Sequence, residues 1–330
     1  MISIREKIVI EGKEIVVLRM TNLSGAYIDV TNIGASITGI VTPDKNGELG
    51  NIVLCYGEVE NYLYDIFYLG TTIGRYANRI SNACFSLKGE TFHVDKNDGN
   101  NSNHGGFTGF NKKIFDYKIY SDSIIFSTKS IDDEGGFPGN LDFSVKYSFS
   151  DDNELLIEYS AISDKLTPVN FTNHTYFNLN TSNNTIWNHE LKVNADHHLE
   201  MDEEFLPTGK ILNVSDSAFD FQEYTYIEKN AQLKKDNLKG YNAFFIKKNK
   251  DIPLASIRDV ISGRVVDVYT SMPGVQIYTG DYLSRPFVPF GGICIEAQYY
   301  PDGVNYEYFE TCILSPNVEK KDFIKFRFSL

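Results

Sequence analysis

Short runs that alternate between apolar and polar residues dominate this chain, and turns rich in Gly, Asn and Asp separate them. Residues 8–10 and 15–18 flank Glu11-Gly12-Lys13, which predicts a hairpin. Residues 85–94 predict a second hairpin, and strict alternation through residues 117–162 predicts an antiparallel meander. The pattern is typical of strands with one buried face.

Helical periodicity is scarce. Asn230–Asn237 could form one helix and Glu58–Tyr64 a short turn. No Gly/Ser/Pro-rich linker, fixed-period repeat or low-complexity block divides the chain. We therefore expect an all-β protein, a sandwich or barrel with few short helices, whose residues 1–330 form a single domain.

The segment Val169–Leu179 reads as one strand because it is rich in β-branched and aromatic residues. Alternation then places only hydrogen-bonding side chains on one face, and His174 lies at its centre. Such a face suits the wall of a wet cavity. A solvated sheet face with a bystander histidine explains the pattern equally well.

Glu296 interrupts the apolar run Ile293–Gln298, and this second polar feature favours the cavity wall over the solvated sheet face. An ionised carboxylate in a buried strand costs several kcal/mol unless it is paired or hydrogen-bonded. Glu296 is therefore either a general base or one half of a structural salt bridge, with Arg79 or Arg285 as the partner.

Three further polar clusters lie at Gly74–Ile80, Asn101–Gly106 and Pro273–Gly280. In the first, we expect Arg75 to be structural, so that Arg79 is the arginine that reaches a ligand. His104 precedes two glycines, which allow a ligand to approach the backbone closely. Amides, histidines, an arginine, a carboxylate and many aromatic rings together suit a sugar-binding cavity.

Composition narrows the classes of partner. The formal charge of −13 argues against nucleic acid and against an anionic membrane surface. The four cysteines are scattered, which suits reduced thiols better than a disulfide framework or a zinc site. A charged N-terminus and the lack of a long apolar run predict a cytoplasmic protein.

Several motifs that would indicate other chemistry are missing from the sequence. It contains no GxGxxG opening a helix, no GxxxxGK[ST], no HExxH and no GxSxG. His197 and His198 could suggest a metal site, but adjacent strand residues point to opposite faces. We expect no metal there.

The clusters, taken in order, resemble the aldose 1-epimerase (galactose mutarotase) family. The matching segments are GRYANRI (74–80), NSNHGG (101–106), GFPGNL (136–141), NHTYFNL (173–179), LPTG (206–209), PGVQIYTG (273–280) and IEAQYYPDGVN (295–305). Together they extend over most of the chain, and their order makes chance agreement implausible.

The resemblance implies a large antiparallel β-sandwich and cofactor-free, metal-free interconversion of the α and β anomers of a free monosaccharide such as galactose or glucose. It implies that Glu296 is the general base and His174 the general acid. The residues that it implies for sugar binding are Asn78, Arg79, His104, Tyr176, Asn242 and Gln276. Two alternatives stay open, a non-catalytic sugar-binding or sensing protein and a hexose-6-phosphate 1-epimerase.

The chemistry works best with His174 protonated and Glu296 ionised, and we expect the nearby carboxylate to raise the pKa of the histidine. Two departures from the family pattern stand out. Asn242 occupies the position of a family aspartate, which predicts weaker or redirected sugar binding with the acid and base intact. The C-terminal residues 323–328 lack the family's tyrosine and threonine, and we interpret them as an edge strand.

Overall fold

The computed structural model describes residues 1–231, 240–249 and 251–330, and strands account for most of its regular structure. Among these residues the α-helix is α1 (Ile227–Ala231), and the predicted turn at 58–64 is the 3₁₀ helix η1 (Val59–Tyr64). The helix predicted over 230–237 falls mostly outside the described residues. None of the described helices is both long and apolar enough to cross a membrane. The other 3₁₀ helices are η2 (Ser81–Ala83), η3 (Gly106–Thr108), η4 (Phe110–Lys112), η5 (Glu134–Gly136) and η6 (Gly303–Asn305).

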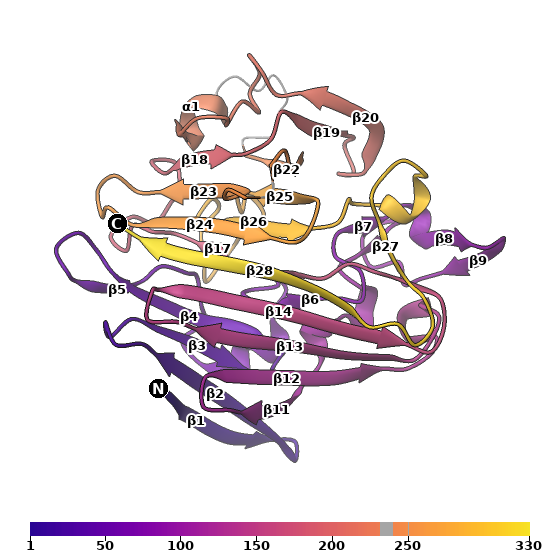
Figure 1. Ribbon diagram of the computed structural model, residues 1–330, viewed down its shortest axis with the longest axis horizontal. Helices are drawn as coiled ribbons and strands as arrows, with labels where there is room; N and C mark the ends of the chain where they lie inside the picture. Colours follow the sequence, from indigo (N-terminus) through magenta and orange to yellow (C-terminus); the bar gives the residue numbers. More distant parts are fainter. Residues whose placement is uncertain (232–239, 250) are drawn as a thin grey trace.

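A nine-stranded antiparallel sheet forms one layer of the molecule and lies across Figure 1. In spatial order its strands are β11 (Asp116–Ile119), β12 (Ser123–Ser130), β13 (Leu141–Phe149), β14 (Glu154–Ser163), β28 (Lys320–Ser329), β24 (Val265–Thr270), β23 (Ala255–Arg258), β18 (Glu190–Val193) and β21 (Thr225–Tyr226). Strands β11 to β14 confirm the predicted meander. The expectation of a C-terminal edge strand is wrong, because β28 pairs with β14 on one side and β24 on the other. Its alternating Ile324, Phe326 and Phe328 are needed in the core.

Two further antiparallel sheets complete the sandwich. A five-stranded sheet contains the predicted N-terminal hairpin and runs in chain order through β1 (Ile2–Ile10), β2 (Lys13–Thr21), β3 (Tyr27–Thr31), β4 (Ser36–Pro43) and β5 (Leu49–Asn51). A six-stranded sheet has the order β17 (Tyr176–Phe177), β26 (Ile293–Gln298), β25 (Gly274–Tyr278), β22 (Asn242–Ile246), β19 (His197–Met201) and β20 (Pro207–Asn213).

Four small pairs of strands shape the loops around these sheets. They are β7 (Arg79–Ile80) with β10 (Ser102–Asn103), β15 (Thr167–Val169) with β27 (Cys312–Leu314), β16 (Thr172–Asn173) with β6 (Thr72–Ile73), and β8 (Cys84–Leu87) with β9 (Glu90–His93). The last pair confirms the predicted hairpin at 85–94.

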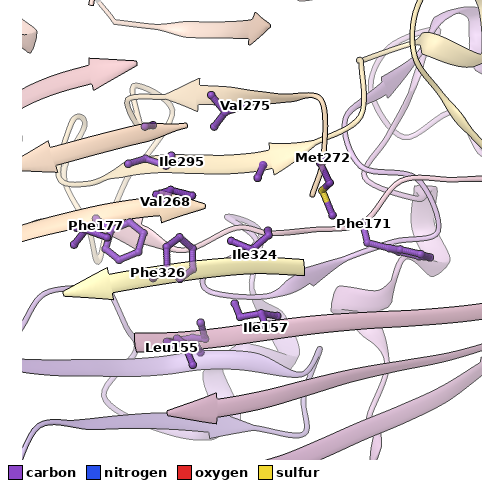
Figure 2. Close-up of a cluster of buried hydrophobic side chains, with 14 of the residues drawn as sticks. Leu155, Ile157, Phe171, Phe177, Val268, Met272, Val275, Ile295, Ile324 and Phe326 are labelled. Atoms are coloured by element: carbon purple, nitrogen blue, oxygen red, sulfur yellow. The ribbon is translucent and has the colours of Figure 1, made fainter. Parts of the chain in front are cut away.

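The main core lies between the layers. Figure 2 shows Phe326 of β28 beside Phe177 of the six-stranded sheet, and Ile157 of β14 and Ile295 of β26 belong to the same cluster. The rings of Phe177 and Phe326 meet edge to face, with centroids 5.2 Å apart. Every second residue of β14 is buried, which is the alternation that predicted the sandwich.

The prediction of one continuous strand over 169–179 is wrong. The chain there forms β15, β16 and β17, which pair with three different strands, and residues 167–180 are all buried. Asn170 donates its side-chain amide to the carbonyls of Ala77 and Tyr299, and Asn178 donates to backbone carbonyls as well. Asn170 and Asn178 therefore satisfy irregular backbone rather than line a wet face.

Candidate functional site

The six-stranded sheet has one apolar face and one chemically reactive face. On β26, Ile293 and Ile295 enter the core, so Cys294 and Glu296 point to the opposite side. Gln276 of β25 lies directly opposite Glu296 in the antiparallel register. The alternation of ordinary strands thus places a buried carboxylate and an amide side by side.

His174 reaches this face from the segment between β16 and β17. Its backbone is fixed by two hydrogen bonds, from its own N–H to Thr71 O at 2.9 Å and from Gly70 N–H to His174 O at 3.0 Å. Its ring nitrogen Nε2 lies 3.6 Å from Oε1 of Glu296. The exposed fractions of the two residues are 4% and 2%, so bulk water does not screen them from each other.

His104 and Asn78 form a second wall through reciprocal contacts. The Asn78 N–H donates to Nδ1 of His104 at 3.2 Å, and the His104 N–H donates to the Asn78 carbonyl at 3.2 Å. Both residues have positive φ, 66° and 52°, which turns the two loops toward each other. Because Nδ1 accepts a hydrogen bond, the neutral His104 ring carries its proton on Nε2.

The two arginines of the 74–80 cluster have different partners, and Arg75 has the structural role predicted for it. Arg75 is buried and donates to backbone carbonyls of the 130–139 segment, including Pro138 O and Gly139 O at 2.9 and 2.8 Å. Arg79 pairs with Asp98 at 2.7 Å. The structural alternative in which Glu296 forms a salt bridge with Arg79 is therefore not what the structure has.

These walls line a cavity of about 170 Å³. The cavity is lined by all eight residues singled out from the sequence, namely Asn78, Arg79, His104, His174, Tyr176, Asn242, Gln276 and Glu296. Sequence reasoning missed the remaining residues of its lining, Ile66, Phe67, Tyr68, Asn103, Tyr278 and Tyr282.

Tyr68 is the most informative of the missed residues. Its ring centroid lies 4.7 Å from that of His104 and 5.8 Å from that of His174. It holds a φ of 58°, which is rare and costly for a bulky side chain. No sequence pattern marks this residue, because it lies in a loop whose shape depends on the carboxylate of Asp65, which accepts the N–H groups of Phe67 and Leu69.

Asn242 lies on β22 and lines the cavity, and its Oδ1 accepts a 2.5 Å hydrogen bond from Nε2 of Gln276. That bond leaves Oε1 of Gln276 buried without a partner among the described residues, and Oε2 of Glu296 is in the same condition. Unsatisfied buried oxygens are costly. A ligand with several hydroxyl donors would satisfy both.

Burial sets the protonation of the site. It lowers the pKa of His174 to about 4 and raises the pKa of Glu296 to about 8, the latter against the opposing charge of Arg79. The pKa of His104 is likewise lowered well below its usual value, first by burial and then by the charges of His174 and Arg79. The expectation that the carboxylate raises the pKa of His174 is therefore wrong, because desolvation outweighs the backbone hydrogen bond that acts in the opposite direction.

Ligand atoms of His104, His174 and Glu296 lie within 4.8 Å of one another, so these three could hold a divalent cation. His197 and His198 do not share such a site. His198 stacks on Phe219, with ring centroids 4.0 Å apart, while the neighbouring His197 is exposed. All four cysteines are free, as the scattered spacing predicts.

Comparisons with known proteins identify the family of the chain. The family model described as aldose 1-epimerase matches residues 16–327. Galactose mutarotase of Mus musculus is 36% identical over 324 residues, which cover 95% of this chain and 93% of the relative. Aldose 1-epimerase of Escherichia coli (strain K12) is 31% identical over 333 residues, which cover 96% of each.

Solved structures give the same answer for the fold. A GalM/aldose epimerase homologue from C. elegans superposes with a TM-score of 0.90 at 27% identity, covering 94% of this chain and 98% of the other. Galactose 1-epimerase from Lactobacillus acidophilus NCFM gives a TM-score of 0.88 at 26% identity, covering 100% and 98%. The chain therefore belongs to the aldose 1-epimerase family and is an isomerase.

Proposed function

We propose that this aldose 1-epimerase interconverts the α and β anomers of free hexoses such as galactose and glucose in the cavity beside β26. One observation carries the proposal. A buried histidine and a buried carboxylate lie 3.6 Å apart in a cavity whose unpartnered oxygens, Glu296 Oε2 and Gln276 Oε1, require hydroxyl donors. A galactose mutarotase and an aldose 1-epimerase among the relatives support the substrate class.

Glu296 removes the proton from the C1 hydroxyl, and Nε2 of His174 gives a proton to the ring oxygen. The C1–O5 bond breaks, which leaves an open-chain aldehyde, a protonated Glu296 and a neutral His174. Rotation about C1–C2 and reversal of both proton transfers close the other anomer. Each positioned acid or base contributes roughly 10²- to 10⁴-fold to the rate.

The pKa shifts of His174 and Glu296 favour the protonation state that ring opening produces. At neutral pH burial favours protonated Glu296 and neutral His174, which is also the protonation of the pair after ring opening. A proton must first move from Glu296 to His174 to form the reactive ion pair. Ring opening then discharges that pair, so the cost of two buried charges is released as the C1–O5 bond breaks.

The other six predicted residues hold the sugar. Asn78, Arg79, His104, Tyr176, Asn242 and Gln276 offer amide, guanidinium, imidazole and phenol groups around the cavity. Hydroxyl groups of a pyranose both donate and accept hydrogen bonds, which this mixture satisfies. We assign no reaction step to a metal.

A phosphorylated sugar fits the cavity less well. Among the described lining residues Arg79 is the cation, and its charge is already paired with Asp98. A phosphate group needs unpaired Arg or Lys donors. A binding-only protein is disfavoured because a sensor does not require a buried acid next to a buried base. We further propose that residues 1–330 form one domain and that the enzyme is cytoplasmic.

Polarimetry tests the substrate class. Freshly dissolved α-D-galactose, α-D-glucose and glucose 6-phosphate are followed with and without the protein. The proposal expects much faster relaxation of at least one free hexose and little acceleration of the phosphate. Acceleration of the phosphate alone would replace the proposal with a hexose-6-phosphate 1-epimerase, and tight binding without any acceleration would replace it with a sugar sensor.

A further inference from the structure

His174 has two ring nitrogens, and the proposed reaction uses only one of them. Nε2 faces Glu296 at 3.6 Å, whereas Nδ1 lies 3.4 Å from the sulfur of Cys294. A histidine that gives and regains a proton at Nε2 must keep its other proton on Nδ1 throughout. The partner of Nδ1 therefore decides whether the ring can work, and in many enzymes that partner is a carboxylate or a carbonyl.

Strand register fixes Cys294 in this position. Cys294 lies two residues before Glu296 on β26, so both side chains leave the strand on the same face. Its neighbours across the sheet are Tyr176 of β17 and Tyr278 of β25. The thiol is fully buried, and burial together with the charge of Glu296 raises its pKa well above the usual value. It is therefore a neutral thiol that can accept a weak hydrogen bond.

We propose that Cys294 is a positioning residue of the reaction, whose sulfur accepts the Nδ1–H of His174 and so keeps Nε2 directed at Glu296 and the sugar. This inference rests on the proposed function for its kinetic consequences, although the contact itself does not. Among the described residues Cys294 provides the side-chain hydrogen bond to the His174 ring, and a hydrogen bond to the backbone of His174 itself also favours the protonated ring. Loss of the sulfur would therefore loosen the ring and allow its proton to move to Nε2.

Sulfur is also a weaker acceptor than oxygen, which matters for the strength of the acid. A weak acceptor at Nδ1 stabilises the imidazolium little, so the protonated His174 gives up its Nε2 proton readily. A stronger acceptor would stabilise the imidazolium and raise the pH at which the ring becomes protonated. The other titratable groups that face the ring are Glu296, His104, Tyr68, Tyr176 and Tyr278.

The contact is tested directly by ¹⁵N NMR of the imidazole nitrogens of His174 at neutral pH, assigned with the His174→Gln variant. The proposal expects a protonated Nδ1 and a bare Nε2 in the wild type. In Cys294→Ala we expect the proton to shift toward Nε2. A wild-type ring protonated on Nε2 would overturn the proposal, because the thiol would then donate to Nδ1 rather than accept from it.

Steady-state kinetics test whether the contact between Cys294 and His174 matters for turnover. We expect Cys294→Ala to lower kcat at least about 10-fold while KM changes less than about 3-fold, as for partners of other functional histidines. Cys294→Ser keeps an acceptor, so it should restore kcat to within about 3-fold of wild type and move the acidic limb of the pH profile upward. Cys312→Ala, at a buried thiol on β27, is the matched control and should leave kcat unchanged.

Thermal unfolding separates loss of function from loss of fold. If Cys294→Ala unfolds at the wild-type temperature and retains wild-type kcat and pH profile, the proposal is wrong. If the wild-type protein accelerates no sugar, the proposed function fails, but the NMR result still decides the contact. A Cys294→Ala variant that does not fold leaves the decision to Cys294→Ser and to the wild-type ¹⁵N spectrum.

Discussion

Desolvation decides the chemistry at the residue scale. His174 and Glu296 are a potential ion pair, yet burial pushes their pKa values to about 4 and about 8, in the directions that favour the neutral forms. From the sequence, a carboxylate near His174 is expected to attract the protonated ring and so to raise the pKa of the histidine. It does not give the depth of burial, which reverses the predicted shift of the histidine.

These shifts predict a bell-shaped pH profile. The pair works with one shared proton, which His174 and Glu296 exchange. Below a pH of about 4 His174 and Glu296 are both protonated, so no carboxylate is left to accept the C1 proton; above about 8 Glu296 loses the shared proton and His174 has none to give. We therefore expect kcat/KM to fall on both sides of this window. Activity that rises steadily through pH 9 would contradict the assignment.

Asn242 offers a second test at this scale. A charged hydrogen-bond acceptor contributes roughly 1.5–3 kcal/mol, against 0.5–1.5 for a neutral one. We therefore expect Asn242→Asp to lower KM by about 10-fold with kcat within about 2-fold, since the acid and base are unchanged. Steady-state polarimetry measures both constants. Asn242→Ala is the control and should raise KM; equal KM values in all three proteins would remove Asn242 from the binding site.

At the scale of elements, regular strands were predictable and the bridging segments were not. Hydrophobic alternation identified the meander of β11 to β14, and the interruption at Glu296 identified the reactive face of β26. The 169–179 segment failed because its three short strands pair with three different partners, and no local pattern specifies such partners. Tyr68 was missed because its loop is shaped by hydrogen bonds from backbone N–H groups to the Asp65 side chain, and no hydrophobic pattern marks such a loop.

The Asp65 carboxylate fixes the backbone of the loop that carries Tyr68. It accepts the N–H of Phe67 at 3.0 Å and that of Leu69 at 2.6 Å, on either side of Tyr68. We expect Asp65→Ala to lower kcat/KM at least about 10-fold and to reduce the melting temperature by several degrees, because the buried N–H of Leu69 and the half-buried N–H of Phe67 lose their partner. Hydrogen exchange of the loop should rise in parallel. The exposed Glu58→Ala, in the same region, is the control.

If hydrogen exchange of the loop does not rise in Asp65→Ala, a loosened loop is not the cause of any kinetic effect of that variant. Wild-type kcat/KM in Asp65→Ala would show that Tyr68 keeps its position against both histidines by other means. The same experiment therefore separates the role of the loop from that of the histidine backbone, which is fixed independently by Gly70 and Thr71.

At the scale of the whole molecule, the sandwich holds the site by supporting the back of the six-stranded sheet. Its core faces the nine-stranded sheet, and the cavity lies on the other side of β25 and β26. Stability and chemistry are thus carried by opposite faces of the same strands. A single domain over residues 1–330 stays a prediction, and the family match to residues 16–327 agrees with it.

This separation predicts that a core change on β14 costs stability without changing the chemistry. Ile157 is fully buried in the main core, so Ile157→Ala should lower the free energy of unfolding by about 2–5 kcal/mol. The folded fraction should keep wild-type kcat. The adjacent surface variant Glu158→Ala should change stability by only about 0.5 kcal/mol. Urea titration gives the stabilities, and a core variant with altered kcat would argue that the two faces are coupled.

The central claim is that the pair of His174 and Glu296 performs the epimerisation. The most direct measurement is polarimetry of α-D-galactose with wild type, Glu296→Gln and His174→Ala, paired with calorimetric titration of the same sugar. We predict that both variants lose at least about 100-fold in kcat while galactose still binds to Glu296→Gln. A variant that retains wild-type turnover, or loss of binding and turnover together in Glu296→Gln, would contradict the account.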